Sequence, residues 1–210
     1  NITIGAARTA AQANGAGYEQ LAFNKLTALQ VLYIVMFKNL NSQAALGQGY
    51  TNNSSAYRDT GATDAKGMTY GTNSGATADD TVKFLGIEDF YGNLYQWVDG
   101  YVSASGLVKI ADGNFNDSGD GYDEHPVANM GIGGYIADVV GDNRLAFTPK
   151  KTNGSGTTYY CDYGNLYPGC VPVFGGYRSD GANAGAFQLH CNYSASGALS
   201  FIGARLCFCG

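Results

Sequence analysis

The sequence predicts an α+β fold in which one or two helices pack on short antiparallel sheets, with long irregular insertions between them. Apolar residues recur at helical spacing in one long segment, residues 19–40. After residue 80, short segments rich in Val, Ile, Tyr and Phe alternate with Gly, Asn and Asp. The chain has 210 residues, and we expect them to form a single domain, 1–210.

The helix predicted over Glu19–Leu40 has the clearest signal. Before it, Ile2–Ile4 predicts a short strand, and the small, polar residues of Gly5–Gly17 predict a strand end and a loop. Asn41, Ser42 and two later glycines are expected to end the helix. Its apolar positions share the three- and four-residue spacing of one packed face: Leu21, Ala22, Leu26, Leu29, Leu32, Tyr33, Met36, Phe37 and Leu40.

Residues 51–80 are mostly Asn, Ser, Thr, Gly, Ala and Asp, which predicts a loop insertion with marginal strands. The rest of the chain predicts short strands bounded by turn residues. These are Val82–Leu85, Leu94–Val98, Gly106–Ile110, Tyr135–Val140, Leu145–Thr148, Thr157–Tyr160, Val171–Phe174, Ala186–His190 and Ala204–Phe208.

Charge and hydropathy exclude several classes of partner. The net charge of −5 and the absence of a basic patch argue against nucleic acid and against an anionic membrane surface. The longest apolar stretch, Val31–Phe37, is far shorter than a bilayer-spanning helix. We therefore expect no nucleic-acid partner and no membrane partner.

The cysteines and histidines do not form a recognisable reactive site. His125 and His190 are the only histidines, and no HxxH, HExxH or paired CxxC spacing occurs. The count of five cysteines is odd; a bridge between Cys161 and Cys170 would close a short loop, but reduced cysteines fit the pattern better. We expect no catalytic residue, no metal and no cofactor.

The acidic stretch Asp112–Glu124 resembles a calcium loop only in part. Asp112, Asn114 and Asn116 occupy the first, third and fifth positions of such a loop, but the sixth and twelfth positions are Asp instead of Gly and Glu. A solvated acidic loop is the favoured interpretation, and calcium binding stays an alternative.

The C-terminal third contains the best candidate for a binding surface. Predicted strands Val171–Phe174, Ala186–Leu189 and Ile202–Leu206 frame two loops, Tyr177–Asp180 and Tyr193–Phe201. These loops carry Tyr, Arg, Leu and Phe where turns usually have Gly, Asn or Ser. Such a composition is typical of binding surfaces, although an ordinary surface with a few buried tyrosines has it too.

Three blocks of the sequence resemble a known group of proteins. Gly175-Gly176, Gly181–Phe187 and Ile202–Leu206 are similar to the variable region of proteins diversified by retroelements, which have a C-type lectin fold. Gly86–Asp99 resembles the Gly-Asn-(aromatic)-x-Trp segment that this group shares with the formylglycine-generating-enzyme superfamily, with Leu94 in the aromatic place. A third block, Leu29–Met36 followed by Asn41–Ala45, is similar to the first helix of phage-borne members.

The resemblance implies a variable region at about residues 174–208. In this family, miscopied adenines in Asn codons yield a limited set of residues that excludes Lys, Glu, Gln, Met and Trp. Asn183 and Asn192 fit positions whose Asn codon is unchanged, while Gln188 must be a position that does not vary. The positions that fit, and that the resemblance implies as ligand-binding, are Tyr177, Arg178, Ser179, Asp180, His190, Tyr193, Ser196, Gly197, Leu199, Ser200 and Phe201.

The resemblance also implies a function without catalysis. The expected protein is a phage tail-fibre adhesin at the virion tail tip, or a bacterial cell-surface protein, that binds a bacterial surface protein or glycan. The family further implies a homotrimer formed through regions outside this sequence. Trp97 is expected in the core, and Arg205 beside carbonyls or acids.

Two alternatives remain for the function. One is a formylglycine-generating-type enzyme, although Cys207 and Cys209 lie beyond the place expected for its cysteine pair. The other is a bacterial surface lectin-like domain with fixed loops. Calcium-dependent sugar binding is unsupported because the family's Glu-Pro-Asn and Trp-Asn-Asp motifs do not occur.

Overall fold

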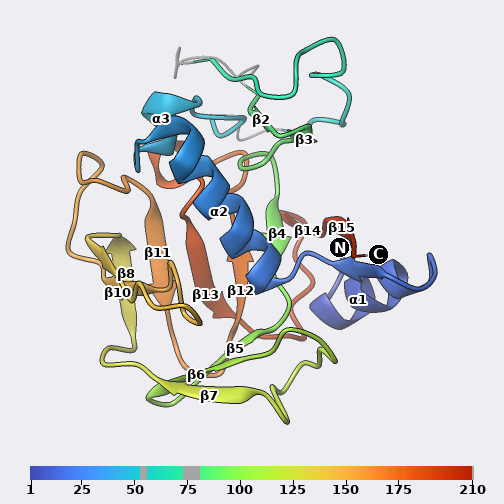
Figure 1. Ribbon diagram of the computed structural model, residues 1–210, viewed down its shortest axis with the longest axis vertical. Coiled ribbons are helices and arrows are strands. Elements are labelled where there is room, and N and C mark those ends of the chain that lie inside the picture. The colour runs from blue at the N-terminus through green and yellow to red at the C-terminus, as the bar shows by residue number, and fades with distance from the viewer. Residues whose placement is uncertain (53–55, 73–80, 210) are drawn as a thin grey trace.

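The computed structural model describes residues 1–52, 56–72 and 81–209, and it is a mixed α+β fold around a six-stranded sheet (Figure 1). The helices are α1 (Ile4–Gln12), α2 (Phe23–Phe37), α3 (Ser42–Ala45) and a short 3-10 turn at Gly181–Asn183. In spatial order the large sheet contains β14 (Ile202–Gly203), β4 (Tyr95–Trp97), β12 (Val171–Phe174), β13 (Leu189–Tyr193), β11 (Tyr163–Leu166) and β8 (Ile132–Tyr135).

Four smaller sheets surround the large one. They pair β1 (Tyr18–Gln20) with β15 (Leu206–Phe208), β2 (Lys83–Phe84) with β3 (Ile87–Glu88), and β9 (Asp138–Val139) with β10 (Pro149–Lys151). The fourth sheet contains β5 (Tyr101–Ala104), β6 (Leu107–Ile110) and β7 (Asp123–Pro126). No helix among the described residues is long and apolar enough to cross a membrane.

The large sheet is mixed, whereas the sequence analysis expected antiparallel sheets. Strands β11 and β13 are parallel, and so are β14 and β4. The cause is topological, because β13 inserts between β11 and β12, two strands that follow each other in the chain and run in opposite directions. One neighbour of β13 must then be parallel to it. The residue pattern of a single strand does not indicate the direction of its neighbours.

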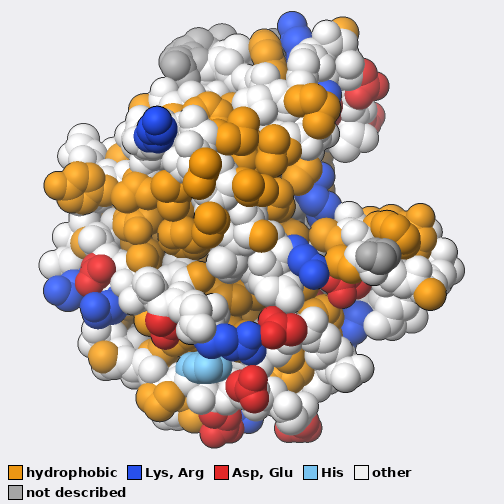
Figure 2. Space-filling model, viewed as in Figure 1, with side chains coloured by type: hydrophobic (Ala, Val, Ile, Leu, Met, Phe, Trp, Pro, Cys, Tyr) orange, Lys and Arg blue, Asp and Glu red, His pale blue; other side chains and the backbone are white. Residues whose placement is uncertain are grey.

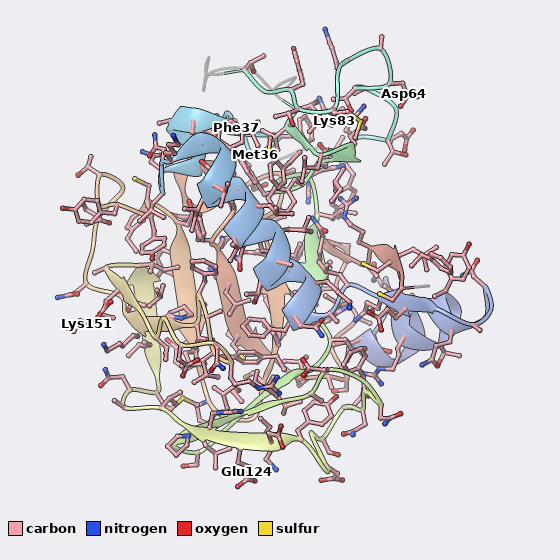
Figure 3. All side chains as sticks on the ribbon, viewed as in Figure 1. Met36, Phe37, Asp64, Lys83, Glu124 and Lys151 are labelled. Atoms are coloured by element: carbon pink, nitrogen blue, oxygen red, sulfur yellow. The ribbon has the colours of Figure 1, made fainter. Side chains whose placement is uncertain are left out.

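Helix α2 crosses one face of the large sheet (Figure 1). Its buried residues include Leu26 and Tyr33, which belong to the same core cluster as Phe174 and Leu189 of the sheet. Phe37, at the C-terminal end of α2 (Figure 3), stacks on Tyr33 with ring centroids 4.8 Å apart. The opposite side of α2 faces outward, and Figure 2 shows a broad apolar area there.

The structure contains the predicted helix, but the helix is shorter than the predicted residues 19–40. The first residues of that range form β1, because Tyr18–Gln20 pairs with Leu206–Phe208 from the other end of the chain. The helix ends at Phe37, where Lys38 adopts a left-handed conformation with φ 51°. Another short helix, α3, then begins at the residues that were expected only to end the predicted helix. The Asn41 side chain caps α3 by accepting a hydrogen bond from the Ala44 N–H.

The predicted strand Ile2–Ile4 and loop Gly5–Gly17 are wrong. Residues 4–12 form α1 instead. The Thr3 hydroxyl caps this helix by accepting a hydrogen bond from the Ala6 N–H, and alanines fill much of its length. Its buried face includes Ile4, which packs with residues of the sheet on the side away from α2.

The two faces of the sheet alternate in the usual way. Trp97, Val173 and His190 lie in one cross-strand row, and the next row contains Phe174 and Leu189. The Phe174 row belongs to the core under α2, whereas Trp97 and Val173 belong to a second core cluster. Because neighbouring strand residues point to opposite faces, the row with His190 faces away from α2.

Several predicted strands are turns. Leu145–Thr148 lies in a turn where the Asp142 carboxylate accepts hydrogen bonds from two following backbone N–H groups. Thr157–Tyr160 is likewise not a strand, since Thr158 donates from its hydroxyl to the Ser155 carbonyl. In both segments, local side-chain bonds to the backbone outweigh strand propensity.

Other boundaries also differ from those expected. The predicted Tyr135–Val140 contains the last residue of β8 and all of β9, and Ile202–Leu206 contains β14 and the first residue of β15. The predicted Ala186–His190 begins only at Leu189. Within the expected insertion 51–80, residues 53–55 and 73–80 lie outside the described residues, and Tyr70 makes an isolated bridge to Lys83.

Candidate functional site

The first predicted loop leaves the sheet at the end of β12. Gly176 begins it with φ 87°, and a Cβ at this position would lie 2.5 Å from the Cβ of Ala184. Only glycine therefore fits here. The turn that follows is closed in both directions, because the Asp180 N–H donates to the Tyr177 carbonyl (3.0 Å) and the Tyr177 N–H donates to the Asp180 carboxylate (3.2 Å).

The two predicted loops meet around one buried ring, that of Tyr95 on β4. We call Tyr95, Tyr177, His190, Tyr193 and Phe201 the ring cluster. Ring centroids of the other four lie 5.2–6.2 Å from that of Tyr95. Tyr177 of the first loop also contacts Phe201 of the second, at 5.1 Å. Residues from both predicted loops thus lie in one cluster.

The sheet holds this cluster in place. Tyr95 is 3 % exposed and Trp97, two residues further along β4, is fully buried, and both belong to the core cluster on the face away from α2. Tyr193 contacts Trp97 edge-on at 6.4 Å. The rings of Tyr177, Tyr193 and Phe201 are half-buried, which leaves part of each available to a ligand.

His190 lies beneath the surface instead of on it. It is 8 % exposed, and its Nδ1 lies 2.9 Å from the Tyr95 hydroxyl. The Tyr163 ring contacts it edge-on. Burial lowers the pKa of His190 to about 4, so its imidazole is neutral at physiological pH. A change at this position would act on a ligand through the rings above it.

The charged members of the predicted set flank the cluster. Asp180 accepts a hydrogen bond from Gln188 at 3.2 Å, and burial raises the pKa of its carboxyl above the ordinary value. The Arg178 guanidinium lies over the ring of Tyr57, 4.1 Å from its centroid. The Arg178 N–H donates to the Asn93 carbonyl and fixes the loop at this point.

The remaining predicted positions lie on the chain outside the ring cluster. Ser179 is exposed at the tip of the first loop. The loop between β13 and β14 carries the rest, where the Gly197 N–H donates to the Ser194 carbonyl and the Ser196 hydroxyl bonds that of Ser194. Three of these positions are exposed, namely Ser196, Leu199 and Ser200.

The two expected scaffold residues are where the resemblance implied. Trp97 is buried in the second core cluster. Arg205 donates to the backbone carbonyls of Glu88 (2.8 Å) and Asp89 (3.0 Å) and to the side-chain oxygen of Gln96 (2.8 Å). Arg205 therefore ties the end of the predicted variable region to the segment that precedes β4 and to β4 itself.

Two residues of the site were missed by sequence reasoning. The sequence predicts Tyr95 only as part of a strand, and its alternation with Trp97 on that short strand is the signal for a shared face. Tyr57 lies in the segment expected to be an insertion, and no local pattern links it to Arg178. Both contacts depend on tertiary structure.

The cysteines are free, and the conceivable Cys161–Cys170 bridge is not formed. Burial raises the pKa of Cys191 to about 12 and that of Cys207 to about 11. A thiol with such a pKa is almost entirely protonated at neutral pH and is a poor nucleophile. Arg205 and Lys25 act to lower the pKa of Cys207, but its burial, with Cys209 and Glu19 nearby, outweighs them.

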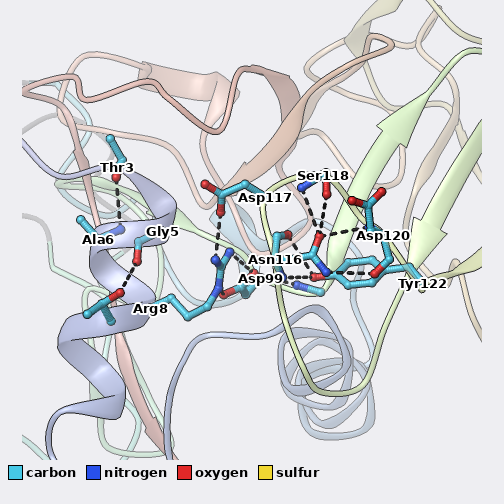
Figure 4. A network of polar contacts seen from close by, with 12 residues as sticks. Thr3, Gly5, Ala6, Arg8, Asp99, Asn116, Asp117, Ser118, Asp120 and Tyr122 are labelled. Atoms are coloured by element: carbon cyan, nitrogen blue, oxygen red, sulfur yellow. Dashed lines mark hydrogen bonds and ion pairs between the residues drawn. The ribbon is translucent and has the colours of Figure 1, made fainter.

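The acidic loop uses its oxygen atoms within the protein (Figure 4). The Asn116 side-chain oxygen accepts hydrogen bonds from two backbone N–H groups and a hydroxyl of the same loop. Asp117 pairs with Arg8 at 2.9 Å, and Asp112 pairs with Arg144 at 2.7 Å. Within residues 1–52, 56–72 and 81–209, no three His, Cys, Asp or Glu side chains are grouped to hold a metal ion.

Comparison with known proteins gives no assignment. No protein-family model matches the chain, and no curated protein matches it. The function must be argued from the residues and from the geometry of the site.

Proposed function

We propose that this chain is a receptor-binding domain with a C-type lectin fold, whose loops are diversified by a retroelement. In this proposal it is a phage tail-fibre adhesin at the virion tail tip that binds a bacterial surface protein or glycan. The alternative location is a bacterial cell surface. Binding, without catalysis or a cofactor, is the function of the site.

The convergence of the variable positions supports this proposal most strongly. Residue type and the resemblance together predict the eleven positions between Tyr177 and Phe201 named above. Four of them surround the single ring of Tyr95, and a fifth, Arg178, lies over Tyr57 at the edge. Positions that vary for binding should share one surface, whereas unrelated surface residues have no reason to.

The environment of these side chains suits binding. Half-buried tyrosine and phenylalanine rings give a ligand contact area with little loss of side-chain entropy, and Arg178 and Asp180 add polar selectivity. Beneath them lie the sheet and the bonds of Arg205, so side chains in the loops can vary without disturbing the core. The high pKa of the buried thiols argues against the formylglycine-generating alternative.

Two displayed libraries test this proposal. The first varies the eleven predicted positions among the residues that Asn codons with miscopied adenines can encode. The matched control varies exposed positions elsewhere, such as Glu124, Asn129 and Lys151. Both are selected for adhesion to a panel of bacterial cells.

We expect the first library to yield folded binders that prefer different cells, and the control library to yield few. The proposal is contradicted if binders arise equally often from both libraries. It is also contradicted if most members of the first library fail to fold, because a diversified surface must tolerate substitution.

A further inference from the structure

Helix α2 carries a second apolar stripe on the side that does not contact the sheet. We call Ala28, Val31, Leu32, Val35 and Met36 the outer stripe. All five are exposed, and the four larger ones by 47 %, 45 %, 65 % and 48 % in that order. Their spacing of three and four residues is the spacing of a helix face that packs against another helix.

The composition of α2 is unusual for a surface helix. Its inner side, with Leu26 and Tyr33, already covers the sheet. Between Lys25 and Lys38 the helix has no charged residue. A helix that is apolar all round is normally buried on all sides. Here the outer side is open in the single chain, which makes it a candidate surface for a partner.

Past the end of the helix, the outer stripe is followed by a hollow that polar residues line for the most part. Figure 2 shows the apolar area spread broadly over α2, and Figure 3 shows Met36 at the C-terminal end of the helix. The hollow has a volume of about 730 Å³ and is bounded on one side by Lys38 and Leu40 and on the other by Tyr159, which is 82 % exposed. Polar residues, among them Thr157 and Thr158, border it. An apolar centre with a polar rim is the anatomy of a protein interface.

The size of this surface fits a contact between two copies of the chain. A fully exposed side chain of this kind has roughly 150–200 Å² of solvent-accessible surface. At their exposed fractions, the outer stripe and Tyr159 together expose on the order of 500 Å² on each copy. Two copies that meet through the same face would bury on the order of 1,000 Å² from these residues alone. That value reaches the size of a specific interface before any polar rim is counted.

We infer that the outer stripe packs against the outer stripe of a second copy, which forms a twofold dimer. A helical stripe is the complement that another helical stripe fits, and the second copy supplies one. The stripe is uncharged although the chain has a net charge of −5, so this face brings two copies together with little repulsion. The ring cluster lies on the opposite face of the sheet and stays open in both copies. This inference does not depend on the proposed function.

Sedimentation velocity of the full chain tests the inference. At about 10 µM we expect a species of twice the chain mass of 22.0 kDa, which corresponds to a dimer with a Kd in the micromolar range or below. The substitutions Val35→Glu and Leu32→Glu, each at an exposed position, should give a monomer with an unchanged circular dichroism spectrum. Met68→Glu is the matched control, because Met68 is 66 % exposed outside the stripe and should leave the dimer intact.

The inference is overturned if the unmodified chain stays monomeric up to about 100 µM, because even a weak dimer with a Kd in the micromolar range would be mostly associated at that concentration. It is equally overturned if both stripe variants sediment as the same dimer as the unmodified chain, because the contact must then lie elsewhere. A dimer lost in Val35→Glu and Leu32→Glu but kept in Met68→Glu supports it.

Discussion

Acid should destabilise this protein through one buried residue of the ring cluster, His190. In the folded chain, burial lowers the pKa of His190 from its ordinary value of 6.5 to about 4. The unfolded chain therefore binds the proton more tightly than the folded chain does. The stability that the neutral imidazole contributes is fully present above pH 6.5 and is lost as the pH falls toward 4.

The magnitude follows from the two pKa values. Between pH 7 and pH 5 the unfolded His190 becomes almost fully protonated, while the folded one stays mostly neutral. The difference in proton binding costs about 2 kcal/mol of unfolding free energy over this interval. Buried carboxyl groups such as Asp180, with a raised pKa, act in the opposite direction, so only a comparison with a variant isolates the histidine.

The assay is chemical denaturation at pH 7, 6 and 5 of the unmodified chain and of His190→Asn. Asparagine does not titrate here and keeps a polar group near the Tyr95 hydroxyl. We expect the unmodified chain to lose about 2 kcal/mol more than the variant between pH 7 and pH 5. His125→Asn, which removes the histidine on β7, is the matched control for the loss of a histidine elsewhere in the chain. If the unfolding free energies of His190→Asn and of the unmodified chain fall by the same amount between pH 7 and pH 5, the reasoning is refuted.

Three further predictions concern the scaffold and the thiols. Asp162 is fully buried and its pKa is raised well above the ordinary value, chiefly by burial. The stability that the protonated Asp162 contributes is therefore present below about pH 4 and is lost as the pH rises. Asp162→Asn should raise the melting temperature at pH 8 but not at pH 4. Equal effects of the substitution at both pH values would contradict this prediction. Arg205→Met removes three hydrogen bonds and should lower the unfolding free energy by about 3 kcal/mol in denaturant titration, and a loss under about 1 kcal/mol would show that the bonds are unimportant. In the native chain a thiol reagent should label the exposed Cys209 quickly and the buried Cys191 only after unfolding, and equal labelling rates would contradict the burial of Cys191.

Sequence reasoning found the elements whose signal is local. Strand β12 has the residues expected of it, and β4 and β6 lie within the predicted segments Leu94–Val98 and Gly106–Ile110. The register of β4 could not be predicted, because pairing with both β12 and β14 depends on segments more than seventy residues away. Strand β7 was missed because its residues, Asp123–Pro126, are mostly polar and lie at a sheet edge.

The same division holds for the site. The two loops were predicted from aromatic and arginine residues where turns usually have small polar ones, and four of the named side chains share the ring cluster. The burial of His190 was not predicted, since its depth depends on Tyr95 and Tyr163 from two other strands. Residue type identified candidates, but only the packed sheet decides which of them a ligand can touch.

We propose that a retroelement diversifies the positions around Tyr95, and the DNA that flanks the gene tests this proposal most directly. We predict a near-copy of the stretch that encodes Gly175–Leu206, close to a reverse transcriptase gene. The copy should differ almost only at adenines, in the codons of the eleven predicted positions. A flanking region without such a copy, or with mismatches spread over all four bases and over codons such as that of Gln188, would contradict the account.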